Sequence, residues 1–176
     1  MKKQLPEIPQ LESGRITMRK LVLSDAASLT ELIKSPKVYR YLPTFLFEKK
    51  YADAETVIAR LYTECLKQSF ILGVFSDGDF CGLAELYGFR DDIHKISLGG
   101  RLLEKYWSRG IATEMLRMMI DYLHTETDIE IITASSMIEN QASANVLRKN
   151  GFMLVVHAAE EDWGYESPTI VDKWIR

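Results

Sequence analysis

The spacing of apolar residues changes several times along the 176-residue chain, and this limits the folds that the chain can adopt. Apolar residues three and four positions apart indicate amphipathic helices, whereas alternation and short apolar runs indicate strands. The pattern predicts strands at 15–23, 70–75, 80–89, 93–103, 130–134, 152–156 and 169–176, and helices at 25–33, 38–42, 52–68, 110–124 and 140–150. Because strands and helices alternate without an internal repeat, we expect one mixed α/β sheet flanked by helices.

Turn and capping residues set the boundaries of these elements. Two prolines and a glycine within residues 1–14 predict an extended lead-in. Ser24 is expected to cap the first helix, and a slip in the alternation at Lys20–Leu21 indicates a β-bulge. Asp77–Gly78 predicts a tight turn that joins two strands in a hairpin, and Asn150–Gly151 predicts a helix end.

Composition excludes several classes of protein. The length suits one domain, so residues 1–176 are expected to form a single unit. A hydrophobic content of 47% with 27% charged residues is near the globular average. A net charge of −3 without a basic stripe disfavours a nucleic-acid partner. No stretch approaches a membrane span and no signal-peptide pattern follows the first lysines, so we expect a soluble protein without a membrane partner.

The cysteines and histidines indicate neither a disulfide framework nor a metal site. Cys65 and Cys81 are too few for a framework, which fits a reducing compartment, and the cytoplasm is the expected location. His94, His124 and His157 lie far apart and share no ligand spacing with cysteines or carboxylates. We therefore expect no metal.

The segment KYWSRGIATEML, residues 105–116, places a turn directly before an apolar helical pattern. A helix N-terminus presents unpaired N–H groups and a partial positive charge, so it can bind a phosphate. Gly110 and Ala112 would let a pyrophosphate approach the backbone. The turn matches neither a P-loop nor GxGxxG, and on spacing alone an ordinary capped helix is the commoner explanation.

Two adjacent glycines, Gly99 and Gly100, lie inside the strand predicted at 93–103. Glycine weakens a strand because it has no side chain to pack. The pair therefore indicates a bulge, or the close approach of another chain or a ligand.

Three segments together resemble one family. GGRLLEKYWSRGIATEML resembles the acetyl-CoA-binding segment of the GCN5-related N-acetyltransferases (GNAT), with Gly110 and Ala112 at its last two small positions and Trp107 in place of its leading Gln or Arg. LESGRITMRKLVLSDAASL and IENQASANVLRKNGF are similar to the opening strand and helix and to the second cofactor motif of one branch. That branch contains the ribosomal-protein alanine acetyltransferases and the spermidine acetyltransferases.

The resemblance implies a fold and a set of acetyl-CoA contacts. It implies a mostly antiparallel, twisted central sheet that splays between its fourth and fifth strands to admit the cofactor. Main-chain groups of Leu102 and Leu103 would hold the pantetheine arm, and Asn140 would bind it near its amide groups. The residues implied to cradle the pyrophosphate are Trp107, Ser108, Arg109, Gly110, Ile111, Ala112 and Thr113. Without the resemblance, Asn140 would be interpreted as a helix N-cap.

The resemblance also implies the catalytic groups. Ser143, one helical turn after Asn140, would stand near the thioester sulfur and supply a proton or hydrogen bond. A backbone N–H within 97–103 would stabilise the oxyanion. The family often places a Glu two residues before the first glycine, and here that residue is Ser97. Alternative bases are Glu85, His94 and the run Glu160, Glu161 and Asp162, with Glu85 the candidate retained.

These observations predict an acetyl-CoA-dependent N-acetyltransferase. The acceptor implied is a primary amine, either a protein N-terminal α-amino group or a small amine such as a polyamine, which would attack the thioester directly. The alternative is a domain that binds acyl-CoA as a sensor or interaction module without transferring anything, and Ser97 favours it. Either a monomer or a homodimer is compatible with the sequence.

Overall fold

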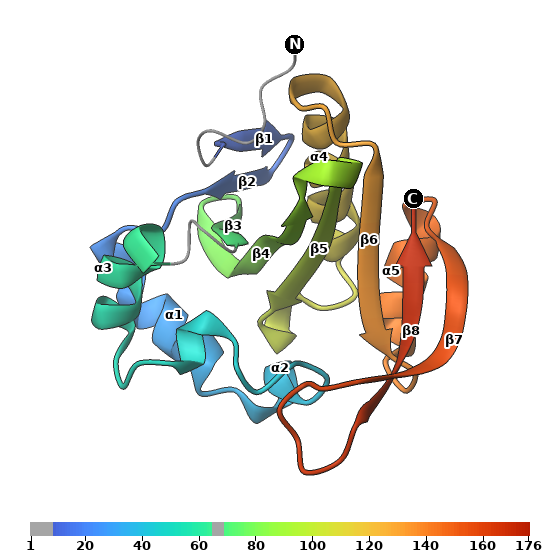
Figure 1. Cartoon of the computed structure of the whole chain (residues 1–176). Coiled ribbons are helices and arrows are strands. Elements are labelled where there is room, and N and C mark those ends of the chain that lie inside the picture. The colour runs from blue at the N-terminus through green and yellow to red at the C-terminus, as the bar shows by residue number, and fades with distance from the viewer. Residues whose placement is uncertain (1–8, 65–68) are drawn as a thin grey trace.

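The computed structural model describes residues 9–64 and 69–176, and within these residues eight strands form one open sheet (Figure 1). The strand order is β1-β2-β3-β4-β5-β6-β8-β7. Neighbouring strands are antiparallel except β5 and β6, which are parallel. The strands are β1 (Leu11–Ser13), β2 (Ile16–Arg19), β3 (Ser69–Ser76), β4 (Asp79–Arg90), β5 (Lys95–Leu102), β6 (Ile131–Met137), β7 (Met153–Glu161) and β8 (Thr169–Ile175).

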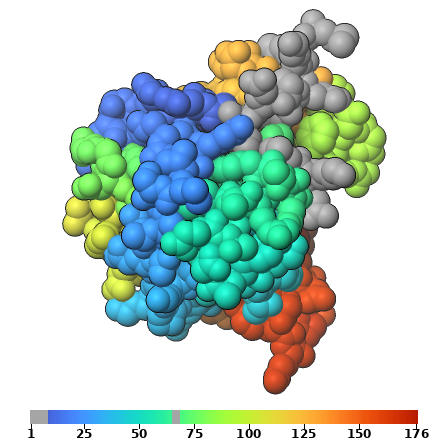
Figure 2. All heavy atoms as spheres, turned by 90° about the vertical axis from the view of Figure 1, so that its left-hand side faces the viewer, coloured from blue at the N-terminus to red at the C-terminus, as the bar shows by residue number. Residues whose placement is uncertain are grey.

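Helices cover both faces of the sheet, and each face has its own apolar core. The helices are α1 (Ala26–Ile33), α2 (Pro36–Tyr39), α3 (Ala54–Glu64), α4 (Ile111–Glu126) and α5 (Gln141–Lys149), with short 3₁₀ turns η1 (Leu23–Asp25), η2 (Phe47–Lys49), η4 (Asp91–Ile93) and η5 (Glu104–Tyr106). Met119 of α4 and Trp174 of β8 belong to one core, and Leu29 of α1 and Leu61 of α3 to the other. Figure 2 shows α1 and α3 side by side on the second face, with the β7–β8 loop projecting beyond them.

The sheet divides between β5 and β6. These strands pair only at Lys95↔Ile131, Ile96↔Ile132 and Ser97↔Thr133, and beyond this point they diverge (Figure 1). β5 continues along β4 as far as Gly82↔Leu102, while β6 continues along β8. The predicted divergence of the fourth and fifth strands is therefore confirmed, since β5 and β6 are those two strands.

The β3–β4 hairpin follows the prediction closely. Asp77 and Gly78 have φ values of 51° and 88°, the left-handed conformation that a two-residue hairpin turn requires. The helix end at Asn150–Gly151 is also confirmed, because α5 stops at Lys149 and Gly151 has a φ of 77°. In both cases the short-range chemistry of the turn is sufficient to set the boundary.

The N-terminal predictions need correction. Residues 11–13 form β1, which pairs with β2, so the extended lead-in predicted for 1–14 was wrong in its last part. Ser24 does not cap α1. It lies within η1, and the carboxylate of Asp25 instead accepts from Val22 N at 2.8 Å and from Arg19 Nη1 at 2.8 Å. The strand predicted at 15–23 ends at Arg19, because this turn takes the following residues out of the sheet.

The helix predicted at 52–68 begins at Ala54, and the residues described for it run to Glu64. Val57, Ile58 and Leu61, which are spaced along one face of this helix, are buried. Residues 65–68, which include Cys65, lie outside the described residues.

Close strand packing predicts a specific stability effect at Gly82. A Cβ at this position would overlap the carbonyl oxygen of Arg101 on β5. Gly82→Ala is therefore expected to lower the free energy of unfolding by about 1–3 kcal/mol, measured by denaturant titration. Gly99→Ala is the matched control, since its Cβ would meet only Tyr87 Cε1 at 3.3 Å, and it should cost less than about 1 kcal/mol. Equal losses in the two variants would contradict this explanation.

Candidate active site

The divergence of β5 and β6 opens a cavity of about 1630 Å³ in the centre of the molecule. Its walls come from β4, β5, β6 and β8, the start of α4, the inner face of α5, and the loops around Tyr41 and Trp163. The predicted cofactor residues that line it are Leu102, Trp107, Ser108, Gly110, Ile111, Ala112, Thr113, Asn140 and Ser143. Glu85 lines it as well, whereas Leu103 and Arg109 do not.

The main chain of β5 is unpaired where it faces the cavity. Leu103 N donates to Cys81 O on β4 at 2.8 Å, and alternate residues of an antiparallel strand bond to the same neighbour. Gly100 and Leu102 therefore direct their N–H and C=O groups away from β4, to the side where β6 has already diverged. The same alternation explains why Leu103 does not contribute, since its N–H is already bonded to β4.

The turn before α4 has an open N-terminus. Ser108 and Gly110 have φ values of 58° and 79°, and no side chain caps the helix at Gly110. The first bond of the helix runs from Glu114 N to Gly110 O at 3.0 Å, so the N–H groups of Ile111 and Ala112 precede the helical ladder. These N–H groups and the helix dipole make the turn a site for an anion.

Trp107 fixes this turn against the end of β5, while Arg109 lies apart from the cavity. Trp107 Nε1 donates to Leu102 O at 2.8 Å. The carbonyl of Leu102 is therefore occupied, and its N–H is the main-chain group left for a ligand. The carbonyl of Arg109 accepts from Arg15 Nη2 at 2.7 Å, and its guanidinium lies 5.7 Å from the Tyr106 ring centre. Arg109 is thus held by the N-terminal hairpin.

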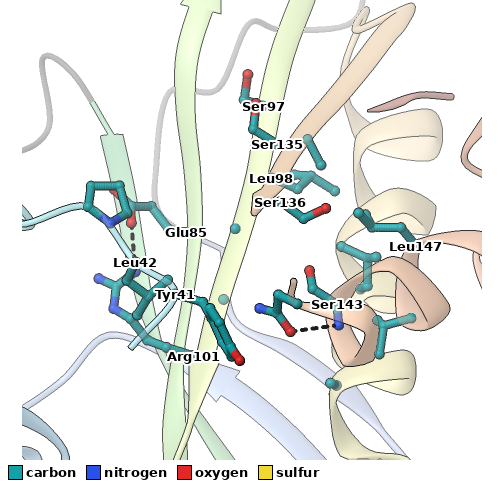
Figure 3. Close-up of a pocket in the computed structure, with 18 of the residues that line it drawn as sticks. Tyr41, Leu42, Glu85, Ser97, Leu98, Arg101, Ser135, Ser136, Ser143 and Leu147 are labelled. Atoms are coloured by element: carbon teal, nitrogen blue, oxygen red, sulfur yellow. Dashed lines mark hydrogen bonds and ion pairs between the residues drawn. The ribbon is translucent and has the colours of Figure 1, made fainter. Parts of the chain in front are cut away.

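Asn140 and Ser143 both line the cavity, and Ser143 lies on its α5 side (Figure 3). Asn140 is the N-cap of α5, and its Oδ1 accepts from Ser143 N at 3.2 Å. The capping role is therefore real. It also fixes the Asn140 side chain, and with it the first turn of α5, at the cavity wall.

The opposite wall holds Ser97, the residue at the family's glutamate position. Ser97 is buried, and its Oγ lies 2.8 Å from Thr133 Oγ1 on β6, at the last pair before the strands diverge. Glu85, across from Gly99 in register, accepts from Arg101 Nη1 through Oε2 at 2.8 Å. Tyr87 lies two residues further along the same strand, and burial together with the charge of Glu85 raises its pKa to about 12. Its phenol is therefore neutral at pH 7.

Of the other four candidate bases, only two line the cavity. Glu161 and Asp162 line the cavity, but His94 and Glu160 do not. Glu161 forms an ion pair with Lys173 and accepts from Trp163 Nε1 at 2.7 Å. Asp162 accepts from Gly164 N at 2.8 Å within the β7–β8 loop.

Sequence reasoning missed three residues of the site, Tyr41, Glu48 and Arg101. Tyr41 comes from the loop after α2 and stands in the cavity between the Arg101 and Ser143 walls (Figure 3). Arg101 is bonded to Glu48, which is 53 residues away in the sequence. The one signal was a charged residue in the strand segment GGRLL; nothing in the sequence indicates Glu48 or Tyr41.

A divided sheet with an unpaired strand edge, facing an uncapped helix N-terminus, offers main-chain groups both to an extended ligand that pairs like a strand and to an anion. Residues 15–153 match the family described as acetyltransferase (GNAT) domain. The chain therefore belongs to the GNAT family and is an N-acetyltransferase by that membership.

Relatives and solved structures agree with this. The chain is 26% identical over 144 residues to the uncharacterized N-acetyltransferase p20 of Bacillus licheniformis, covering 81% of each protein. It is similar in fold to the ribosomal L7/L12 α-N-protein acetyltransferase RimL in complex with coenzyme A, with a TM-score of 0.81, 17% identity and coverage of 96% and 97%. It is also similar to spermidine N-acetyltransferase from Vibrio cholerae in complex with CoA and spermine, with a TM-score of 0.75, 18% identity and coverage of 93% and 96%.

The described part of the chain contains neither a membrane-spanning helix nor a cluster of metal ligands. No helix there is long and apolar enough to span a bilayer. No group of three or more His, Cys, Asp or Glu side chains in that part of the chain could hold a metal ion.

The open turn predicts a binding defect at Gly110. A Cβ there meets no protein atom within 4 Å, so Gly110→Val would fill the space beside the unpaired N–H groups without disturbing the core. We expect the affinity for CoA to fall more than tenfold in calorimetric titration. Gly78→Val is the control, because Gly78 also has positive φ and open surroundings but lies in the distant hairpin turn. It should carry a similar backbone strain and bind CoA normally; equal loss in both variants would argue against the anion site.

Proposed function

We propose that this protein transfers the acetyl group of acetyl-CoA to a primary amine, by direct attack of the amine on the thioester. The observation that carries the proposal is the meeting of three features in one cavity: the uncapped N-terminus of α4, the unpaired edge of β5, and the first turn of α5. The CoA complexes of RimL and of spermidine N-acetyltransferase support it, because both proteins share this fold.

Each cofactor contact follows from a main-chain or side-chain group on the cavity wall. The turn from Trp107 to Thr113 would hold the pyrophosphate through its N–H groups. Gly100 and Leu102 would pair with the amides of the pantetheine arm as an added strand does. Asn140, held at the start of α5, would bind the same arm from the opposite side. Acetyl-CoA supplies the activated acetyl group.

The reaction requires few protein groups. The neutral amine forms a bond to the carbonyl carbon as the C–S bond breaks, and the one proton that the nitrogen loses passes to the sulfur; an amine that arrives as an ammonium ion must first lose a further proton. The N–H of Gly100, the first beyond the β5–β6 ladder, is the candidate donor to the oxyanion. Ser143 is the candidate donor to the sulfur, and Glu85 is the carboxylate retained for the amine side.

The acceptor is a protein N-terminal α-amino group or a small amine such as a polyamine. RimL, whose described target is ribosomal L7/L12, supports the first, and the spermidine enzyme supports the second. The proposal includes a cytoplasmic location, which agrees with Cys81 being a buried free thiol, and a monomer or homodimer.

Calorimetric titration with acetyl-CoA and then CoA tests the cofactor site, and thiol release tests the transfer. The acceptor panel is spermidine and tripeptide amides that begin with alanine, serine or methionine. Micromolar binding with thiol release supports the transferase. Binding without release by any amine favours the alternative, an acyl-CoA sensor or interaction module, for which Ser97 in place of the family's glutamate is the supporting observation. If neither acetyl-CoA nor CoA binds, both the transferase and the sensor are overturned.

Ser143→Ala is expected to lower kcat about a hundredfold while the calorimetric Kd for CoA stays within about twofold, because the hydroxyl would act on the departing sulfur. Ser143→Thr keeps a hydroxyl at this position and should retain most of the activity. A kcat that is unchanged in the alanine variant would remove Ser143 from the mechanism.

A further inference from the structure

A cluster of buried charged groups lies under the acceptor side of the cavity. It consists of Glu48 on η2, Arg101 on β5 and Glu85 on β4, and Tyr39 of α2 donates to Glu48 Oε1 at 2.9 Å. Arg101 Nη2 donates to Glu48 Oε2 at 2.7 Å and Nη1 to Glu85 Oε2 at 2.8 Å. Arg101 Nε lies 2.5 Å from Glu48 Oε1, in an ion-pair contact that lacks the alignment of a hydrogen bond.

This charge cluster is unbalanced. Burial lowers the pKa of Arg101, but Glu48 and Glu85 outweigh burial and raise it, so the guanidinium stays charged. Burial and then the charge of Glu48 raise the pKa of Tyr39, so its phenol stays neutral. Two carboxylates thus share one cation, and among the described residues no second lysine or arginine forms an ion pair with either carboxylate. With both carboxylates ionised, the cluster carries one excess negative charge.

Of the two carboxylates in the charge cluster, Glu85 is the one that faces the cavity. The side chain of Glu48 is 1% exposed and does not line the cavity, whereas that of Glu85 is 13% exposed and does. Glu85 is also opposite Gly99 in register, beside the unpaired main chain of β5. A cation bound at Glu85 would therefore sit next to the strand edge proposed to hold the acetyl donor.

We propose that Glu85 binds the ammonium group of the acceptor, which supplies the second cation that the charge cluster lacks. Arg101 and Glu48 are positioning residues that act through Glu85, because together they set the net charge that it presents to the cavity. The inference rests on the proposed function and deepens it, because it assigns the acceptor site to an amine that arrives protonated and gives Glu85 an anchoring role in place of a base. The bound ammonium group loses one proton to solvent before the neutral amine attacks. A substrate with a hydroxyl at the same place would leave the charge unbalanced.

Glu85→Gln separates the two roles. For the panel amine with the highest kcat/KM, an anchor predicts a KM at least tenfold higher, a kcat within about threefold, and unchanged CoA affinity. A large loss of kcat at constant KM would overturn the anchoring role, as would no change in either. Glu55→Gln, the same substitution at an exposed residue of α3 outside the cavity, is the control and should behave as wild type.

Two further variants test the charge rather than the packing. Glu48→Gln leaves one carboxylate and one guanidinium, so KM should rise as in Glu85→Gln although residue 48 does not face the cavity. Adding Arg101→Met to Glu48→Gln restores the single negative charge at Glu85, and KM should recover. The role assigned to the charge cluster is overturned if the KM of this double variant does not recover although the protein unfolds at the same temperature as the Glu48→Gln variant.

Binding of the panel amines to the CoA-saturated protein, measured by calorimetry, separates this inference from the proposed function. Transfer by the wild type with no effect of Glu85→Gln overturns the inference alone. Amine binding that Glu85→Gln weakens at least tenfold, without any transfer, supports the inference and removes the transferase. If the amines neither bind nor are acetylated, both the inference and the proposed function are overturned.

Discussion

The loss of pairing between β5 and β6 is the constraint on which the site depends. An unpaired strand edge inside a protein is costly, because its N–H and C=O groups need partners. β6 supplies them only as far as Thr133, because the two strands diverge beyond that pair. The N–H and C=O of Gly100 and the N–H of Leu102 are thus left facing a cavity that a ligand with its own amides can fill, while the C=O of Leu102 accepts from Trp107. A ligand bound there would complete the sheet, so binding and the fold would use the same kind of hydrogen bond.

Close packing on the other side of β5 keeps this edge in place. Gly82 on β4 lets the main chain at Arg101 approach, and Gly100 leaves room for Met115 of α4. These contacts place α4 against the strand, and Trp107 then bonds the turn before α4 to the end of β5. The positions of the strand edge and of the helix N-terminus are therefore coupled, although the two features would bind different parts of one cofactor.

Local patterns predicted the elements that short-range chemistry determines. The β3–β4 hairpin follows from alternation and Asp77–Gly78, and the α5 N-cap at Asn140 follows from its position before a helical run. β1 was missed because three residues are too few to show a period, and Ser24 was misassigned because a 3₁₀ turn precedes α1. The family resemblance indicated the cavity wall formed by the turn before α4 and by α5, but the wall around Glu85 depends on contacts such as Arg101 with Glu48, for which the sequence has no spacing rule.

Stability alone does not account for the charge cluster under that wall. Replacing a buried ion pair by apolar residues of similar volume is often neutral or stabilising, so a protein gains little from burying three charges. An odd number of them is less favourable still, because two carboxylates then share one cation. In this protein Glu85 is the carboxylate of the cluster that faces the cavity. A cationic substrate bound at Glu85 would neutralise this excess charge, and the complex would then have the neutral interior that the free protein lacks. The excess charge is therefore better explained by binding than by folding.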